Sequence, residues 1–156
     1  MACFGDGKES YVETLGKLAQ QRGVAGRFRF AGSVPPDLIQ EAIAGADAGI
    51  IAVQRGAISY NLALPSKLFE CVFAGLPVVA SDLVEIRTLV NEYGLGTLVD
   101  ERSPEAIAKG MRALMDARER YRGEAWESRQ KAFVDRFDWR VHKMVLLDEF
   151  ERLGQS

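Results

Sequence analysis

The chain has 156 residues, which is enough for one domain with a sizeable core. Apolar residues make up 47% and charged residues 27%, and the formal net charge is −2 with both signs interspersed. This composition is typical of a globular protein and gives no electrostatic case for nucleic-acid binding. No apolar run approaches the roughly 20 residues that a membrane helix needs, and the first residues lack the pattern of a signal peptide.

The few cysteines and histidines predict reduced thiols and no metal site. Cys3 and Cys71 lie far apart in sequence, and His142 is the single histidine. A zinc site of the usual kind needs more such ligands. Two distant thiols without a leader segment are expected to stay reduced in the cytoplasm. We therefore expect a cytoplasmic protein without a metal, in which His142 is a helix residue and not a catalyst.

The chain opens on a short expected strand, residues 2–4, that leads directly into Gly5-Asp6-Gly7. In an α/β domain, this is a strand's carboxyl end turning into a helix, where such domains bind ligands. A simple turn is the alternative for Gly5 and Gly7, because Gly-x-Gly alone is weak evidence for phosphate binding. The brevity of the strand leads us to expect that the chain begins inside a domain rather than at its edge.

Residues 8–22 have the apolar spacing of a helix, and residues 27–31 alternate as a strand. The loop after this strand holds Ser33 and Val34. Their backbone groups could recognise the edge of a base without help from side chains. A plain connection between two elements is the alternative interpretation.

A further helical pattern precedes a buried strand at residues 49–53, and the loop after this strand is long. It runs for about eleven residues, 54–64, which exceeds the usual connection and indicates function or mobility. Arg55 in this loop could contact a phosphate. An exposed arginine without a ligand is the simpler interpretation.

The most informative stretch, residues 64–81, predicts a loop, a helix, a sharp stop and a buried strand. Pro65 suits the first helical position, where its missing N–H costs nothing. Gly75 is placed to end the helix with a positive φ, and Pro77 prevents the helix from resuming. The apolar run that follows predicts a strand at residues 77–80 that is covered on both faces.

The front of this helix has the groups that bind an anion. Ser66 and Lys67 present the first backbone N–H donors, and the helix dipole adds to their effect. Lys67 also carries a full positive charge for a phosphate. Glu70 follows Lys67 by three residues and Ser66 by four, so the three share one face and the carboxylate could bind two ribose hydroxyls. An ordinary first turn with a surface Lys–Glu pair is the alternative.

The rest of the chain predicts a last strand at residues 96–100 and several helices. Asp82, Ser103 and Asp138 are placed to cap three of these helices, and Pro104 suits a first helical position. One of the last two expected helices runs through Trp126 and Phe133, and the final helix carries Trp139, Met144, Val145, Leu147 and Phe150. The tryptophans and Met144 are expected to lie in the core.

Arginines cluster between the expected helices after residue 104, at Arg112, Arg118, Arg120 and Arg122. A membrane-binding patch is conceivable there. Glu119 and Glu124 lie among these arginines, and a surface binder wants unmixed positive charge. A solvated face is therefore the favoured interpretation.

Residues 65–70 (PSKLFE) and 74–80 (AGLPVVA) resemble the donor-site signature of retaining glycosyltransferases with the GT-B fold. Three further segments match that family in order and spacing: residues 5–7 (GDG), 30–34 (FAGSV) and 46–51 (ADAGII). The resemblance covers nearly the whole chain. It implies the C-terminal, nucleotide-sugar-binding domain, without the acceptor domain or the basic pair that usually precedes it.

The resemblance implies a transferase of the hexosyltransferase class that moves a sugar from a UDP- or GDP-sugar to a glycan or lipid-linked acceptor. It implies no cofactor, no metal and no nucleic acid, and it assigns acceptor and membrane contact to the absent N-terminal part. No residue of this chain is expected to be a general base or nucleophile, and the chain alone is expected not to turn over. The expected donor-binding residues are Gly5, Gly7, Ser33, Val34, Ser66, Lys67 and Glu70.

One position departs from the commoner family pattern. That pattern has a second glutamate eight residues before the ribose-binding one, near the sugar hydroxyls, and Leu62 stands there in this chain. A Pro-Ser-Lys variant such as residues 65–67 is a familiar alternative in the same superfamily. The departure leaves the way in which the sugar is held, and so its identity, open.

Strands that alternate with helices predict one α/β domain over residues 1–156, with a doubly wound, Rossmann-like parallel sheet in three α/β/α layers. The resemblance implies that this domain is one half of a GT-B fold. Five strands are expected, at residues 2–4, 27–31, 49–53, 77–80 and 96–100. Two other functions stay open. A sugar-nucleotide epimerase domain would need acid/base carboxylates near the sugar, and a non-enzymatic α/β module would serve protein association.

Overall fold

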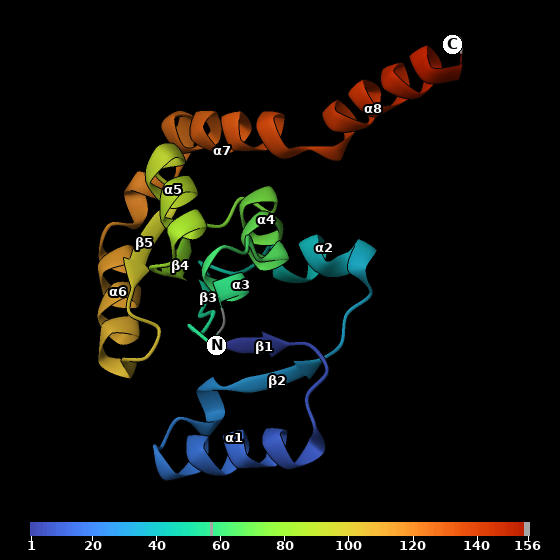
Figure 1. Ribbon diagram of the computed structural model, residues 1–156. Helices are drawn as coiled ribbons and strands as arrows, with labels where there is room; N and C mark the ends of the chain where they lie inside the picture. Colours follow the sequence, from blue (N-terminus) through green and yellow to red (C-terminus); the bar gives the residue numbers. More distant parts are fainter. Residues whose placement is uncertain (57, 155–156) are drawn as a thin grey trace. The chain divides into compact units, whose positions relative to one another are not determined.

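The computed structural model describes residues 1–56 and 58–154 as parallel strands and helices in an α/β arrangement (Figure 1). The chain divides into two compact units, Met1–Ala42 and Ile43–Ser156, and each is described by itself. Every expected strand is present, within one or two residues of its expected bounds. The α/β fold class predicted from the sequence is therefore confirmed. The single five-stranded sheet is not, because the described strands pair as one sheet of two strands and another of three.

The first unit pairs two strands side by side. β1 (Ala2–Phe4) and β2 (Arg29–Gly32) are parallel, and α1 (Glu9–Gln21) connects them through a short 3₁₀ turn at Ala25–Arg27. Gly23 ends α1 as predicted, with a φ of 64° that favours glycine. After β2, a 3₁₀ turn at Pro36–Leu38 leads into α2 (Ile39–Ile43).

The second unit is built on a three-stranded parallel sheet. The strands are β3 (Gly49–Ile51), β4 (Val78–Ser81) and β5 (Gly96–Val99), with β4 in the centre. Gly49 pairs with Val78, which pairs with Gly96 on its other side. All residues of β4 are buried, so the strand covered on both faces is confirmed.

Helices cover both faces of this sheet and give it three layers (Figure 1). On one face, Val78 and Ala80 join the larger apolar core with residues of α4 (Ser66–Phe73), α5 (Val84–Tyr93) and α7 (Gly123–Phe137). On the other face, Val79 and Val99 pack with Leu114 of α6 (Pro104–Asp116). The alternation of side chains along a strand therefore serves a core on each side.

Two of the three predicted caps are confirmed, and the third is wrong. The Ser103 hydroxyl accepts a hydrogen bond from the Ala106 N–H at 3.1 Å, and Pro104 begins α6. The Asp138 carboxylate accepts one from the Arg140 N–H at 2.7 Å, at the start of α8 (Trp139–Gly154). Leu83, not Asp82, is the cap position of α5. The Asp82 carboxylate instead binds the charged Arg87 side chain, a stronger partner than a backbone N–H.

The core prediction is confirmed for α7 and wrong for α8. Trp126 and Phe133 of α7 are buried. The expected core residues of α8 are exposed, because that helix contacts α7 and otherwise extends away from the sheet of its unit (Figure 1). They are Trp139 and Met144, and Val145, Leu147 and Phe150 of the same helix are exposed as well.

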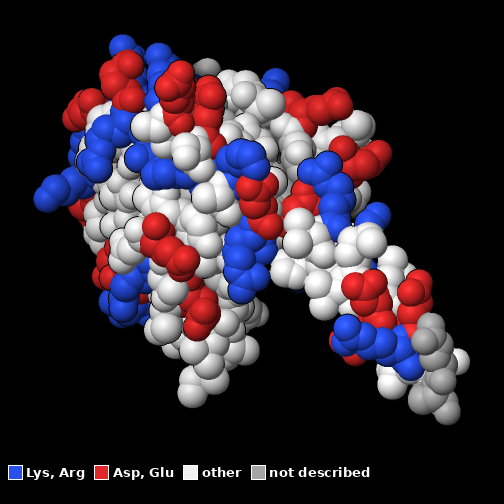
Figure 2. Space-filling model, turned by 90° about the horizontal axis from the view of Figure 1, so that it is seen from above, with Lys and Arg blue, Asp and Glu red and all other residues white. Residues whose placement is uncertain are grey.

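The surface carries charges of both signs. Figure 2 shows Lys and Arg side chains interspersed with Asp and Glu over the face that it views. In the arginine cluster, Arg118 and Arg122 both lie near the Glu119 carboxylate, at 3.3 and 3.8 Å. This pairing supports the solvated face over the membrane patch. Among the described helices, none combines the length and apolarity needed to cross a membrane.

Candidate functional site

The first turn of α4 presents the anion-binding groups expected from the sequence. Pro65 lies one position earlier than expected, in the extended cap position, and the helix begins at Ser66. No side chain of the described residues caps this end, and the Pro65 carbonyl accepts the Leu68 N–H at 3.0 Å. The N–H groups of Ser66 and Lys67 are therefore the donors that α4 offers to an anion.

The same helix places Glu70 one turn after this pair of donors. Ser66 and Lys67 are exposed, and Glu70 is half-buried. Leu68 and Val72 are fully buried on the opposite side, against the core. The helix therefore turns its apolar stripe inward and leaves the Ser66–Lys67–Glu70 face toward solvent, as the spacing predicts.

The far end of α4 is held by α7. Gly75 has a φ of 82°, so the helix ends at the glycine that the sequence indicates. The Gln130 side chain donates to the Val72 carbonyl at 3.0 Å, and the Trp126 ring N–H donates to the Gly75 carbonyl at 3.1 Å. The Val72 carbonyl also accepts the Gly75 N–H at 3.0 Å, so the two side chains of α7 add to the hydrogen bonds at this helix end. Sequence analysis missed this link, because it joins residues more than 50 positions apart.

Aromatic rings fix the orientation of α4 against α7. Phe69 packs on Phe133 and Phe137 with ring centroids 5.6 and 5.4 Å apart. Phe73 packs edge-on against Phe133 at 6.1 Å. Such ring pairs add to the free energy of burial by about 0.5–1.5 kcal/mol each. The aromatic rings of α7 thus pack against the helix that carries the candidate site.

Cys71 of α4 is not a reactive thiol. The pKa of its thiol is raised to about 11, first by burial and next by the Glu70 carboxylate, whereas the Lys67 ammonium acts in the opposite direction. A thiol with so high a pKa stays protonated at neutral pH and is a poor nucleophile. The chemistry of α4 therefore lies in its charges and N–H groups.

The other expected site residues lie in the first unit, at the ends of its paired strands. Gly5 has a φ of 129° and donates its N–H to the Gly32 carbonyl at 2.8 Å. This bond brings the loop with Gly5 and Gly7 beside the loop with Ser33 and Val34. Within that unit, the structure brings these four residues together. Their role in donor binding stays a prediction.

Gly7 is also a packed position. A Cβ atom there would lie 3.0 Å from Val12 Cγ2 and 3.2 Å from Phe30 Cζ, so a side chain would press on both. Ser33 is exposed and Val34 is half-buried. Packing therefore accounts for a glycine at position 7, and the choice between a phosphate-binding loop and a simple connection stays open.

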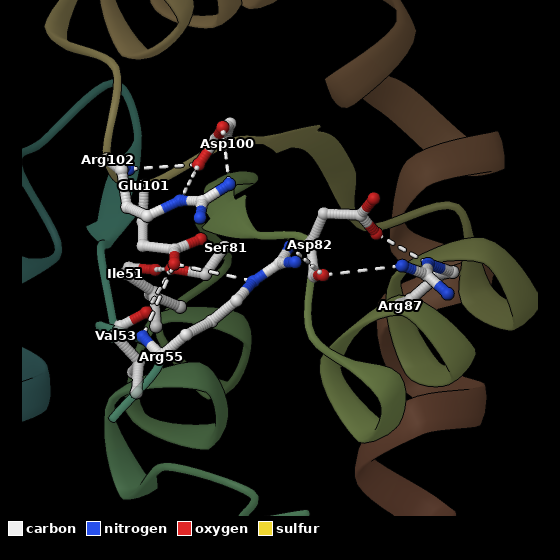
Figure 3. A network of polar contacts seen from close by, with 9 residues as sticks. All are labelled: Ile51, Val53, Arg55, Ser81, Asp82, Arg87, Asp100, Glu101 and Arg102. Atoms are coloured by element: carbon white, nitrogen blue, oxygen red, sulfur yellow. Dashed lines mark hydrogen bonds and ion pairs between the residues drawn. The ribbon is translucent and has the colours of Figure 1, made fainter. Parts of the chain in front are cut away.

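Arg55 is not the exposed arginine without partners that the sequence favoured. Its Nε lies 3.4 Å from Glu101 Oε1, and its Nη2 donates to the Asp82 carbonyl at 2.8 Å (Figure 3). Ser81 and Glu101 were not singled out from the sequence. The signal that could have found them is position, because each lies at or just after the carboxyl end of a strand.

Asp82 joins this network through its charge. The pKa of its carboxyl lies below the ordinary value, first because it accepts a hydrogen bond from Arg87 and also because the positive charges of Arg87 and Arg55 are close. Burial acts in the opposite direction. At the carboxyl edge of the sheet, Arg87 and Arg55 therefore both lie close to the Asp82 carboxylate.

A small hollow of about 140 Å³ lies elsewhere in the second unit. Its lining includes Asp47 and Pro77, which precede β3 and β4, so it opens at the amino edge of the sheet. Ligand pockets usually measure about 300–1,000 Å³. This hollow is therefore too small for a nucleotide sugar, and it does not include Ser66, Lys67 or Glu70.

Within the described residues, no group of three or more His, Cys, Asp or Glu side chains is placed to hold a metal ion. His142 lies on α8, and its Nε2 is 2.9 Å from the Arg136 carbonyl oxygen. The expectation that no metal takes part stays a prediction.

Comparison with known proteins identifies what the chain resembles. A family model described as Glycosyl transferases group 1 matches residues 1–117. The chain is 31% identical over 169 residues to a phosphatidyl-myo-inositol mannosyltransferase of Mycobacterium leprae (strain TN), covering 100% of this chain and 41% of that protein. It is 33% identical over 111 residues to a GDP-mannose-dependent alpha-(1-6)-phosphatidylinositol monomannoside mannosyltransferase of Mycobacterium tuberculosis (strain ATCC 25618 / H37Rv), covering 70% and 29%.

A solved structure shares the fold. Sucrose-phosphate synthase from Thermosynechococcus elongatus superposes with a TM-score of 0.73 at 18% identity, over 99% of this chain and 38% of that chain. This likeness confirms one half of a GT-B fold as the architecture. The chain spans 41% and 29% of the length of the two mannosyltransferases above. By the family match over residues 1–117, the chain belongs to the glycosyl transferases group 1 family.

Proposed function

We propose that this chain is the donor-binding part of a glycosyltransferase that moves a hexose-type sugar from a nucleoside-diphosphate sugar to a glycan or lipid-linked acceptor. The observation that carries the proposal is the solvent-facing Ser66–Lys67–Glu70 face of α4. Cys71 of this helix lies against Gly49 at the start of β3, so the first turn of α4 points toward the carboxyl edge of the sheet, where such sheets bind ligands. The names of two mannosyltransferase relatives support a mannose donor, and one of them names GDP-mannose.

Ser66 and Lys67 would hold the donor diphosphate. Their N–H groups are the open donors of the first turn of α4, and the Lys67 ammonium is exposed beside them. Negative charge grows on the diphosphate as the bond to the sugar breaks. Fixed donors aimed at that charge stabilise the transition state without rearranging. Holding the leaving group is therefore the catalytic contribution that we propose for this helix.

Glu70 would hold the ribose of the same nucleotide. A carboxylate accepts hydrogen bonds through both oxygens and can take up two neighbouring hydroxyls. Its position one turn behind the N–H donors sets the distance between the diphosphate and the pentose. We propose no general base, nucleophile or metal within this chain.

Direct titration tests the proposal. Isothermal calorimetry of the full chain with GDP, UDP, GDP-mannose and UDP-glucose is expected to give binding tighter than about 1 mM, or roughly −4 kcal/mol, for at least one base. Binding is expected to persist in EDTA. Flat titrations with all four ligands at millimolar concentration would overturn the proposal, and a concentration-dependent mass in that case would favour an association module. Conversion of a donor sugar without acceptor would point to an epimerase.

A further inference from the structure

The ends of the three strands in the second unit are tied together at one edge of the sheet. Ser81 is the last residue of β4 and is fully buried. Its hydroxyl donates to the Val53 carbonyl at 2.8 Å, and the Ile51 carbonyl lies at 3.2 Å as a second acceptor (Figure 3). Ser81 thus holds the chain both at the end of β3 and just beyond it.

Glu101 binds the same segment from β5, the strand on the other side of the central strand β4. It follows β5 by two residues, and its side chain is 0% exposed. Its Oε1 accepts the Arg55 N–H at 3.3 Å and lies 3.4 Å from Arg55 Nε. Backbone and side chain of Arg55 therefore meet one carboxylate oxygen (Figure 3).

Burying the Glu101 carboxylate costs free energy that packing alone does not explain. Its second oxygen, Oε2, is buried and has no hydrogen-bond partner among the described residues. A buried carboxylate is unfavourable unless its charge is paired, and a neutral residue of the same shape would cost less to bury. The helix that follows does not need it, because Ser103 caps α6. The Glu101 carboxylate therefore serves to bind Arg55.

We propose that Arg55 is a positioning residue of the donor site, and that Glu101 and Ser81 anchor it. The inference rests on the function proposed above. The segment after β3, residues 52–56, precedes α3 (Ile58–Asn61) and then α4. Cys71 in the second half of α4 lies against Gly49 at the start of β3, so the first turn of α4 points toward the carboxyl edge, where Arg55 follows β3. By fixing that segment, the Arg55–Glu101 pair sets where Ser66 and Lys67 are presented to the diphosphate.

The Arg55–Glu101 pair can be tested by substitution, because Arg55 is partly exposed. Its side chain is 39% exposed, so replacing it does not create a core cavity. Arg87 is a matched control at the same edge. It is 48% exposed and binds the Asp82 carboxylate. Both arginines donate to the Asp82 carbonyl, Arg55 at 2.8 Å and Arg87 at 3.3 Å, but Arg55 alone of the two also binds Glu101. Arg87 makes no hydrogen bond or ion pair to residues 52–56 within the described chain.

Three variants of the full chain test the inference: R55M, the double variant R55M/E101Q, and the control R87M. R55M is expected to lower the affinity for the tightest-binding nucleoside diphosphate about tenfold. It is also expected to speed amide hydrogen exchange in residues 52–56. R55M/E101Q removes the buried charge that R55M leaves unpaired, so it is expected to regain thermal stability without regaining affinity. R87M is expected to keep affinity within about twofold.

The outcomes separate this inference from the proposed function. If the unaltered chain binds a nucleotide and R55M/E101Q binds it equally well, the positioning role is overturned while the proposed function stands. If the unaltered chain binds no nucleotide, the proposed function fails, and the exchange measurement still decides whether Arg55 anchors residues 52–56. Exchange in that segment no faster in R55M than in R87M overturns the anchor.

Discussion

Replacing Glu70 with alanine is expected to weaken the binding of a nucleoside diphosphate about a hundredfold. The carboxylate would accept two ribose hydroxyls, and a hydrogen bond to a charged group contributes about 1.5–3 kcal/mol. Glu70 is half-buried on the exposed face of α4, whereas Leu68 and Val72 face the core. The substitution therefore removes ligand contacts without opening a cavity.

Calorimetric titration of E70A checks this result, with E127A as the control. Glu127 is an exposed glutamate on α7, and its loss is expected to leave affinity unchanged. A 2′-deoxy nucleoside diphosphate sharpens the test. The unaltered chain is expected to bind this deoxynucleotide more weakly than the ribonucleotide. E70A is expected to bind both nucleotides with the same affinity, because it lacks the carboxylate that binds the 2′-hydroxyl. Equal affinity of E70A and the unaltered chain for the ribonucleotide contradicts the role of Glu70.

Phe133→Ala is expected to lower the free energy of unfolding by roughly 3–5 kcal/mol. Phe133 is 0% exposed and contacts rings of α4, α5 and α7. Its centroid lies 5.6 Å from that of Phe69, 5.4 Å from Tyr93 and 4.8 Å from Phe137. Its loss leaves a cavity where three helices meet.

Urea unfolding followed by circular dichroism measures this change, with Phe150→Ala as the matched control. Phe150 is 63% exposed on α8, so its replacement is expected to change the free energy of unfolding by no more than about 0.5 kcal/mol. A cost for F133A no larger than that for F150A would show that the cluster does not support α4.

Local signals were enough to predict most elements. The strands follow from short apolar runs between turn residues, and Gly75 could be placed because its positive φ is a local requirement. The caps at Ser103 and Asp138 are likewise local, since donor and acceptor lie within three residues. Asp82 failed as a cap because a side chain five residues on, Arg87, competes for its carboxylate.

Contacts across long sequence separations could not be predicted. Apolar residues at helical spacing in α8 indicate an apolar face but not what covers it, so Trp139 and Met144 were wrongly expected in the core. The Ser66–Lys67–Glu70 face was predictable because it depends only on helical spacing. The Arg55–Glu101 pair joins residues 46 positions apart, and only the order of the strands brings them together.

The central claim is that the first turn of α4 holds a diphosphate while Glu70 binds the ribose. The crystal structure of the chain with the tighter-binding of GDP and UDP tests it most directly. The account predicts diphosphate oxygens about 2.7–3.2 Å from the N–H groups of Ser66 and Lys67, with ribose hydroxyls on the Glu70 carboxylate. A nucleotide bound away from α4, with Glu70 contacting none of its atoms, would contradict it.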